Sequence, residues 1–232
     1  MKHLIETTDS SSLATVRYDR IVLDSSTNDV IVKGGGYEYV DLGLPSGLKW
    51  AKCNVGAEKE TDYGDYFQWG STKANTPNEC TWKHAPFNGG NRRYSADAFN
   101  QVKDTVCPNG ILAKKYDAAA QIMGSEWRMP TQADFNELLS GTTNRWITNY
   151  NDTGVNGRKF TSKTNGNSIF IPAAGSCVDG EVYDVGDYGD VWSSSLDTSS
   201  PSYAWDLGLG SSLCSMDSYY RYNGRSVRGV RK

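Results

Sequence analysis

The sequence has few of the residues from which catalytic and metal sites are usually built. Its 232 residues include only two histidines, His3 and His84, and each stands alone in a polar context. The sequence therefore has too few histidines to favour a Ser-His-Asp or Cys-His catalytic site, or a zinc site with histidine ligands. The phosphate-binding loop and the dinucleotide-binding fingerprint are absent as well. We expect no enzyme activity, no cofactor and no bound metal.

Long apolar runs and clusters of positive charge are also missing. No stretch approaches the roughly 18 apolar residues of a membrane-spanning helix, so no membrane span is expected. The net charge is -3, and the 24 Lys and Arg residues form no sustained stripe, which argues against nucleic acid as a partner. Residues 1–9 carry acids and lack the apolar core of a signal peptide. The sequence thus predicts synthesis without a signal, with a phage virion or cell surface as destination and the cytoplasm otherwise.

The cysteines form an odd set with no C-x-x-C spacing: Cys53, Cys80, Cys107, Cys177 and Cys214. An odd number rules out a complete set of disulfides within one chain, and the spacing argues against a metal site. Pairing of Cys80 with Cys107 under oxidising conditions stays open.

Residues 199–223 have an unusual composition. Ser, Tyr, Asp, Gly, Cys and Asn fill 17 of these 25 positions, whereas Lys, Glu and Gln are absent. We call these 17 the displayed residues: Ser199, Ser200, Ser202, Tyr203, Asp206, Gly208, Gly210, Ser211, Ser212, Cys214, Ser215, Asp217, Ser218, Tyr219, Tyr220, Tyr222 and Asn223. All six residue types can be reached from one AAC or AAT codon by changing its adenines.

Large apolar residues alternate with the displayed residues at strand spacing. Trp205, Leu207 and Leu209 share one face of an expected strand, and Asp206, Gly208 and Gly210 share the other. This pattern predicts a buried face formed by Trp192, Trp205, Leu207, Leu209, Leu213 and Met216. Asp206, Tyr219, Tyr220 and Tyr222 are expected to be largely exposed. Low-complexity disorder is the alternative, but disordered segments lack such interleaved Trp and Leu.

Several motifs, in order along residues 37–232, resemble the Fibrobacter succinogenes major paralogous domain. They are Tyr39–Ala51 (YVDLGLPSGLKWA), Cys53–Ala57 (CNVGA), Trp127–Thr131 (WRMPT), Ile171–Gly175 (IPAAG), Trp192–Ser195 (WSSS) and Ser226–Arg231 (SVRGVR). The resemblance implies a C-type-lectin-like fold. It also implies, for some members, a C-terminal region rewritten at template adenines by the reverse transcriptase of a diversity-generating retroelement. Lys52 and Gly229 depart from the pattern, where a small or hydroxyl residue and Pro are expected.

The expected organisation is an α+β chain with two readable parts. Residues 1–36 form a short N-terminal β segment, with strands at 15–18, 21–23 and 30–32 and a glycine hinge at 34–36. Residues 37–232 form the C-type-lectin-like domain, with a ligand-binding region at about 179–223. Residues 71–110 are expected to be an irregular excursion. Whether the N-terminal segment packs on this domain or on another subunit stays open.

Two helices are expected in the first part of the domain. One runs from Ala113 to Met123 and ends at Gly124. The other follows Thr131, the expected N-cap, with Asp134 completing a capping box and residues 135, 138 and 139 facing the core before Gly141. From Lys159 onward the sequence indicates short strands and turns.

The function that the sequence favours is ligand binding. Tyrosines give contact area at low entropic cost, and Ser, Gly and Asn adapt around them, as in antibody paratopes. We expect the displayed residues to form one side of the site and an upstream set to line the opposite side: Asp179, Tyr183, Asp184, Asp187, Tyr188 and Asp190. The partner would be a protein or glycan on a bacterial surface, and a tail-fibre location would favour a homotrimer.

Three alternatives compete with this interpretation. The first is a structural surface domain of the same family with no variable site. The second is a calcium-dependent sugar-binding lectin using Glu181, Asp184, Asp187 and Asp190, although the spacing does not reproduce a D-x-D-x-D-G loop and the lectin sugar signatures are missing. The third is an enzyme like the formylglycine-generating enzymes, which share the lectin-like fold but need a suitably placed cysteine pair; fold alone does not carry activity.

Overall fold

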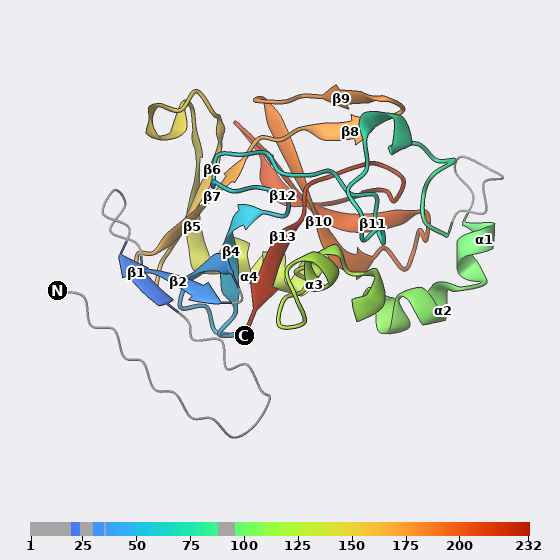
Figure 1. Ribbon diagram of the computed structural model, residues 1–232, viewed down its shortest axis with the longest axis horizontal. Coiled ribbons are helices and arrows are strands. Elements are labelled where there is room, and N and C mark those ends of the chain that lie inside the picture. Colours follow the sequence, from blue (N-terminus) through green and yellow to red (C-terminus); the bar gives the residue numbers. More distant parts are fainter. Residues whose placement is uncertain (1–19, 24–29, 35, 88–95) are drawn as a thin grey trace, which may run out of the picture.

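The strands of this protein pair in antiparallel fashion. The structure is a computed structural model that describes residues 20–23, 30–34, 36–87 and 96–232. Its widest sheet has the order β1-β2-β3-β4-β13, formed by Arg20–Leu23, Val30–Gly34, Tyr37–Asp41, Lys49–Asn54 and Arg228–Arg231. The C-terminal strand thus lies beside a strand from the start of the domain (Figure 1). The chain is mostly β-sheet with few helices and is of the α+β class, as the sequence predicts.

Three smaller antiparallel sheets complete the molecule. One has the order β5-β6-β7, at Thr142–Ile147, Gly157–Ser162 and Ser168–Pro172. A two-stranded sheet pairs β8 (Ser176–Val178) with β9 (Glu181–Tyr183). The third has the order β10-β11-β12, at Tyr188–Leu196, Tyr203–Gly210 and Cys214–Tyr220. The last two sheets position the site described below; in Figure 1, β8 and β9 lie at the top and β10, β11 and β12 lie beneath them.

The helices are short except for α4 (Gln132–Gly141). Thr131 caps α4 through its hydroxyl, and Asp134 returns a hydrogen bond to the Thr131 backbone, so the predicted capping box is confirmed. Phe135 and Leu138 are buried, whereas Leu139 is only partly buried. The Phe135 ring lies 5.4 Å from that of Trp50, which joins α4 to the widest sheet.

The first predicted helix is wrong in its extent. Residues 113–123 contain a 3-10 turn at Lys114–Tyr116 and a separate helix α3 at Ala118–Ile122. Asp117 breaks the run because its extended backbone places its carboxylate where it accepts from the amides of Ala120 and Met129. The predicted stop is confirmed, since Gly124 follows the C-cap with a φ of +104°.

The predicted irregular excursion at 71–110 contains short helical pieces. These are the 3-10 turns Pro77–Glu79 and Pro108–Gly110 and the one-turn helices α1 (Asp97–Asn100) and α2 (Lys103–Val106); a further 3-10 turn lies at Tyr150–Asp152. In the N-terminal segment β2 pairs with β3, so its strands extend the widest sheet. The predicted strand at 15–18 and His3 lie outside the described residues.

Two clusters of apolar side chains form the core. The first gathers Trp69, Phe99, Trp127 and Trp192, and the second gathers Trp50, Phe135, Leu207 and Leu209 around the inner faces of the sheets. The fully buried Arg228 donates to Asn54 Oδ1, to the carbonyls of Ala51 and Lys52, and to that of Phe170. Burial lowers the pKa of its guanidinium to about 10. None of the helices in the described ranges has the length and apolar character needed to cross a membrane.

Candidate ligand-binding pocket

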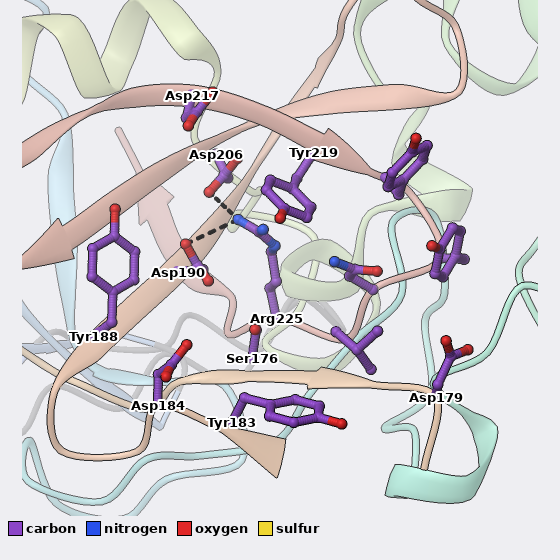
Figure 2. A pocket seen from close by; sticks show the side chains of 14 residues that line it. Ser176, Asp179, Tyr183, Asp184, Tyr188, Asp190, Asp206, Asp217, Tyr219 and Arg225 are labelled. Carbon is purple, nitrogen blue, oxygen red and sulfur yellow. Dashed lines mark hydrogen bonds and ion pairs between the residues drawn. The ribbon is translucent and has the colours of Figure 1, made fainter. Parts of the chain in front are cut away.

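A cavity of about 480 Å³ opens between the β8-β9 hairpin and the β10-β11-β12 sheet. Figure 2 shows Tyr183 and Asp184 on one side of it and Asp217 and Tyr219 on the other. Fourteen residues line the cavity: Ser176, Val178, Asp179, Tyr183, Asp184, Tyr188, Asp190, Asp206, Asp217, Tyr219, Tyr220, Tyr222, Asn223 and Arg225. Tyr183 and Asp184 thus lie across the cavity from the displayed residues, whereas Tyr188 and Asp190 belong to β10, in the same sheet as those residues.

The floor of the pocket is held by an early segment of the chain. Phe67 and Arg225 exchange backbone hydrogen bonds of 2.9 and 3.0 Å, and the Trp69 amide donates to the Arg221 carbonyl. The buried Gln68 side chain donates to the carbonyls of Tyr222 and Thr81. Residues 221–225 are thus fixed by backbone contacts that do not depend on their side chains.

Two buried tryptophans connect β10 to residues 67–69, which hold the pocket floor. Trp192 Nε1 donates to the Phe67 carbonyl at 2.8 Å, and Trp69 Nε1 donates to the Ser193 carbonyl at 2.9 Å. Both indoles are fully buried, so each satisfies its single N–H donor within the core. These crossed bonds join β10 to the segment that carries the pocket floor.

Arg225 sits at the centre of the floor between two buried carboxylates (Figure 2). Its Nη1 lies 3.0 Å from Asp190 Oδ1 and also donates to Asp206 Oδ2. Its guanidinium carbon lies 4.9 Å from the ring centroid of Trp192 and 4.5 Å from that of Tyr219, so the group is held between two aromatic faces. A buried charge placed in this way needs both its ion pairs and its hydrogen bonds to be tolerated.

The two carboxylates have unusual proton affinity. Burial raises the pKa of Asp206 well above its ordinary value of 3.8, with Asp190 and Asp217 adding to the increase and Arg225 opposing it. Burial likewise raises the pKa of Asp190 against the effect of Arg225. Since one guanidinium faces two buried carboxylates, the pair binds a proton more readily than two solvated carboxylates would, and the larger increase in pKa falls on Asp206.

Tyrosine rings build the rim of the pocket. The Tyr203 and Tyr220 centroids lie 4.4 Å apart, those of Tyr220 and Tyr222 lie 5.2 Å apart, and Tyr219 meets Tyr220 edge-on at 6.2 Å. A hydrogen bond with Tyr220, together with partial burial, raises the pKa of Tyr203 to about 12. The rim is therefore a packed row of rings, which limits the rotamer freedom that a ligand would have to freeze.

Two buried thiols lie behind the β8-β9 wall. Cys80 and Cys177 are both free and hydrogen-bonded to each other, and this bond with burial raises the pKa of the Cys80 thiol. The Asp179 amide donates to the Cys80 carbonyl, and Cys177 exchanges backbone bonds with Gly224. All five cysteines are free, so the Cys80–Cys107 disulfide is not formed.

The displayed residues divide into two groups. Asp206, Asp217, Tyr219, Tyr220, Tyr222 and Asn223 line the cavity together with the upstream residues Asp179, Tyr183, Asp184, Tyr188 and Asp190. The others lie outside its lining: Ser199, Ser200, Ser202, Tyr203, Gly208, Gly210, Ser211, Ser212, Cys214, Ser215, Ser218 and, upstream, Asp187. Ser199, Ser200 and Ser218 instead hydrogen-bond to Asp197, which stabilises the β10-β11 turn.

The predicted exposure is wrong at several of these positions. Asp206 is 0% exposed because Arg225 and Tyr219 cover its face of β11, Tyr222 is 7% exposed because it packs in the tyrosine row, and Asn223 is 2% exposed. Gly208 and Gly210 are buried under the Tyr188 ring, where an added Cβ would lie 2.6 and 2.7 Å from its atoms.

The predicted core also needs correction. Leu207, Leu209 and Trp192 are buried as predicted, whereas Leu213 is 53% exposed because it lies in the turn between β11 and β12. Trp205, on the central strand β11, and Met216, on the edge strand β12, are only half-buried.

Three lining residues escaped the sequence analysis: Ser176, Val178 and Arg225. Arg225 lies just beyond the displayed stretch, and no local pattern distinguishes it from a solvated arginine. Its role depends on Asp190 and Phe67, which are distant in sequence, so spacing carries no signal for it.

The acids of the site do not converge on one point. Across the described ranges, no group of three or more His, Cys, Asp or Glu side chains is arranged to hold a metal ion. The pocket combines carboxylates, tyrosine faces and one buried arginine. Comparison with known proteins found no matching family model, no matching curated protein and no matching solved structure.

Proposed function

We propose that this protein binds a ligand on a bacterial surface through the pocket between β8-β9 and β10-β12. The observation that carries the proposal is the composition of the lining: eleven of its fourteen residues belong to the displayed or upstream sets predicted from the sequence. A purely structural role does not require these residue types to gather around one cavity. Rigid tyrosines beside small polar residues are the means by which paratopes gain contact area at low entropic cost.

We also propose for this protein the fold and the origin that its resemblance to the Fibrobacter succinogenes major paralogous domain implies. A C-type-lectin-like domain whose C-terminal region is rewritten by a diversity-generating retroelement accounts for the adenine-reachable residue types at 199–223. The protein would act as a receptor-recognition component of a phage virion or as a cell-surface adhesin. Sequencing the neighbouring DNA tests this origin: a near-copy of the final coding stretch beside a reverse-transcriptase gene is expected, and its absence would contradict diversification.

Binding itself is tested by substituting two exposed residues that line the pocket, and this double substitution is called the rim variant. Labelled protein is incubated with a panel of intact gut bacteria, and cell-bound label is measured against protein concentration. The variant Asp217→Ser with Tyr219→Ser removes one exposed carboxylate and one exposed ring from the lining. The control, Asp104→Ser with Val102→Ser, removes an exposed carboxylate and an exposed apolar side chain outside that lining.

Saturable binding to some strains is expected, with loss in the rim variant and retention in the control. Equal binding by both variants would place recognition elsewhere, and the absence of saturable binding to any strain would favour a structural surface domain. Loss of binding in both would indicate general destabilisation, so melting temperatures are recorded in parallel, and only folded variants are compared.

A further inference from the structure

The charges around the pocket are strongly unbalanced. Among the lining residues, five aspartates face a single arginine: Asp179, Asp184, Asp190, Asp206 and Asp217 against Arg225. Asp190 is offset by Arg225, and burial favours the protonated form of Asp206. Asp179, Asp184 and Asp217 are exposed at the mouth. The pocket therefore attracts positive charge and repels anions.

The floor also contains an acceptor that lacks a donor. Asn223 is 2% exposed, lines the cavity, and its Oδ1 has no hydrogen-bond partner. A buried acceptor without a donor is unfavourable, so a ligand that brings an N–H group to this floor removes a standing penalty.

The walls suit an organic cation better than a metal ion. The carboxylates are spread around the cavity, and within the described residues no metal-binding cluster forms. Arg225 already places a guanidinium against the Tyr219 ring, and the rings of Tyr220 and Tyr222 line the same cavity. Aromatic faces attract alkylammonium and guanidinium groups by the same cation–π effect.

We propose that this pocket binds the side chain of a lysine or arginine on a protein partner, through its acidic mouth, its tyrosine faces and the unpaired Asn223 acceptor of its floor. The inference rests on the proposed function and names the chemical group that the site recognises. A tyrosine-rich rim around the pocket matches the composition of surfaces that bind proteins.

The test compares two small probes of the same shape that differ in charge. Butylguanidinium is titrated into the isotopically labelled full chain, and backbone amide shifts are followed by NMR; butylurea is the neutral match. We expect saturable shifts at residues 217–225 with butylguanidinium, and binding about tenfold weaker with butylurea, because charge-assisted hydrogen bonds are roughly twice as strong as neutral ones. Equal binding of the two probes, or no binding of either, would overturn the proposal.

Substitutions locate the cation within the pocket. Asp217→Asn is expected to weaken butylguanidinium about two- to fivefold, as for an exposed ion pair, and Asn223→Ala about three- to tenfold through loss of an acceptor. Asp104→Asn removes an exposed charge outside the lining and should leave the affinity unchanged. Equal weakening by Asp217→Asn and Asp104→Asn would show attraction to net charge alone and would contradict a specific site.

The source of the cation is tested with three further probes. Blocked Gly-Lys-Gly and Gly-Arg-Gly peptides carry the proposed side chains, and glucosamine carries an ammonium on a sugar. Tighter binding of either peptide than of glucosamine supports a protein partner, and the reverse order would replace it with an amino sugar. Failure of every cationic probe, while rim substitutions still abolish binding to bacteria, would reject the cation and leave the proposed function standing.

Discussion

Arg225 connects the charged and aromatic groups on the floor of the pocket. Its guanidinium joins two carboxylates that are themselves buried, and it separates the rings of Trp192 and Tyr219. Removing one member of a buried ion network leaves the others without compensation, which costs more than the network contributes when intact. Loss of this one side chain would therefore leave two buried carboxylates without their counter-charge, although the backbone contacts of residues 221–225 would remain.

Substitution of Arg225 by methionine tests that dependence. Arg225→Met keeps the length of the side chain but leaves Asp190 and Asp206 facing each other, so the free energy of unfolding should fall by about 3 to 5 kcal/mol. Arg158→Met is the control: its guanidinium is partly exposed and bonds to Asn144 and to backbone carbonyls, so a loss of about 1 kcal/mol is expected. Urea denaturation measures both. A loss below 1 kcal/mol for Arg225→Met would contradict the buried network.

Asp206 gives stability a pH dependence whose sign is fixed by its raised pKa. A carboxyl that binds its proton more tightly in the folded state contributes its full stabilisation at pH values below the pKa that it has in the unfolded state, here 3.8. That contribution is lost as the pH rises through the folded pKa. The unfolding free energy of the wild type relative to Asp206→Asn should therefore decrease from pH 4 upward. It is measured by denaturation at a series of pH values.

Asp134 has a lowered pKa and therefore the opposite pH dependence to Asp206. Hydrogen bonds from Arg128 and Thr131 outweigh partial burial and lower its pKa, so its contribution is present above 3.8 and is lost only as the pH falls through the folded value. The difference between wild type and Asp134→Asn should stay constant from pH 5 to 8. A constant difference for Asp206→Asn over the same range would show that its carboxyl is ionised throughout.

At the scale of elements, the β11-β12 hairpin combines a buried and an open part. Leu207 and Leu209 are completely buried in the second core cluster, whereas Ser211, Ser212 and Leu213 in the turn are exposed. Tolerance to substitution should follow this division and not the residue types.

The hairpin is tested with two sets of substitutions. Replacing Ser211, Ser212 and Leu213 together by other small or polar residues should change the melting temperature little, since each exposed change costs within about 0.5 kcal/mol. Leu207→Ala and Leu209→Ala should each cost about 2 to 5 kcal/mol. Differential scanning calorimetry compares the two sets. Similar losses in both would mean that the turn is part of the core.

The sequence pattern predicts β11 and the start of α4 because residues close together in the chain determine both. The alternation at 205–210 correctly separates Leu207 and Leu209 from Asp206, and the Thr131 to Asp134 spacing correctly starts α4. Alternation assigns a residue to a face, but it cannot tell that Arg225, from another segment, covers that face. In the same way, the alanines at 118–120 favour a helix and Asp117 caps it locally through the Ala120 amide, but the second bond that holds Asp117, from the distant Met129 amide, leaves no local signal.

At the scale of the whole molecule, the pocket depends on contacts between segments far apart in the chain. Residues 67–69 hold residues 221–225, and Cys80 lies against Cys177 behind the wall. No spacing in the sequence encodes these pairings, which is why the composition of the site could be predicted but its floor could not. The sequence motifs that suggest a lectin-like domain likewise leave the exposure of each displayed residue undetermined.

Ligand binding should not depend on a metal ion. The carboxylates around the pocket do not converge in the described structure, so binding to bacteria is expected to be the same in EDTA and in calcium. The measurement is the cell-binding assay with and without chelator. Loss of binding in EDTA that calcium restores would revive the calcium-dependent lectin alternative through Asp184, Asp187 and Asp190.

The burial of Asp206 limits how many sequences this site can use. Under the proposed retroelement origin, its codon would be rewritten in the same way as those of the turn serines. Each replacement would nevertheless have to leave Arg225 a tolerable partner inside the protein, and Gly208 and Gly210 would have to leave room for the Tyr188 ring. The repertoire of folded variants would then be smaller than the product of the codon choices, and selection for folding would act before any ligand is met.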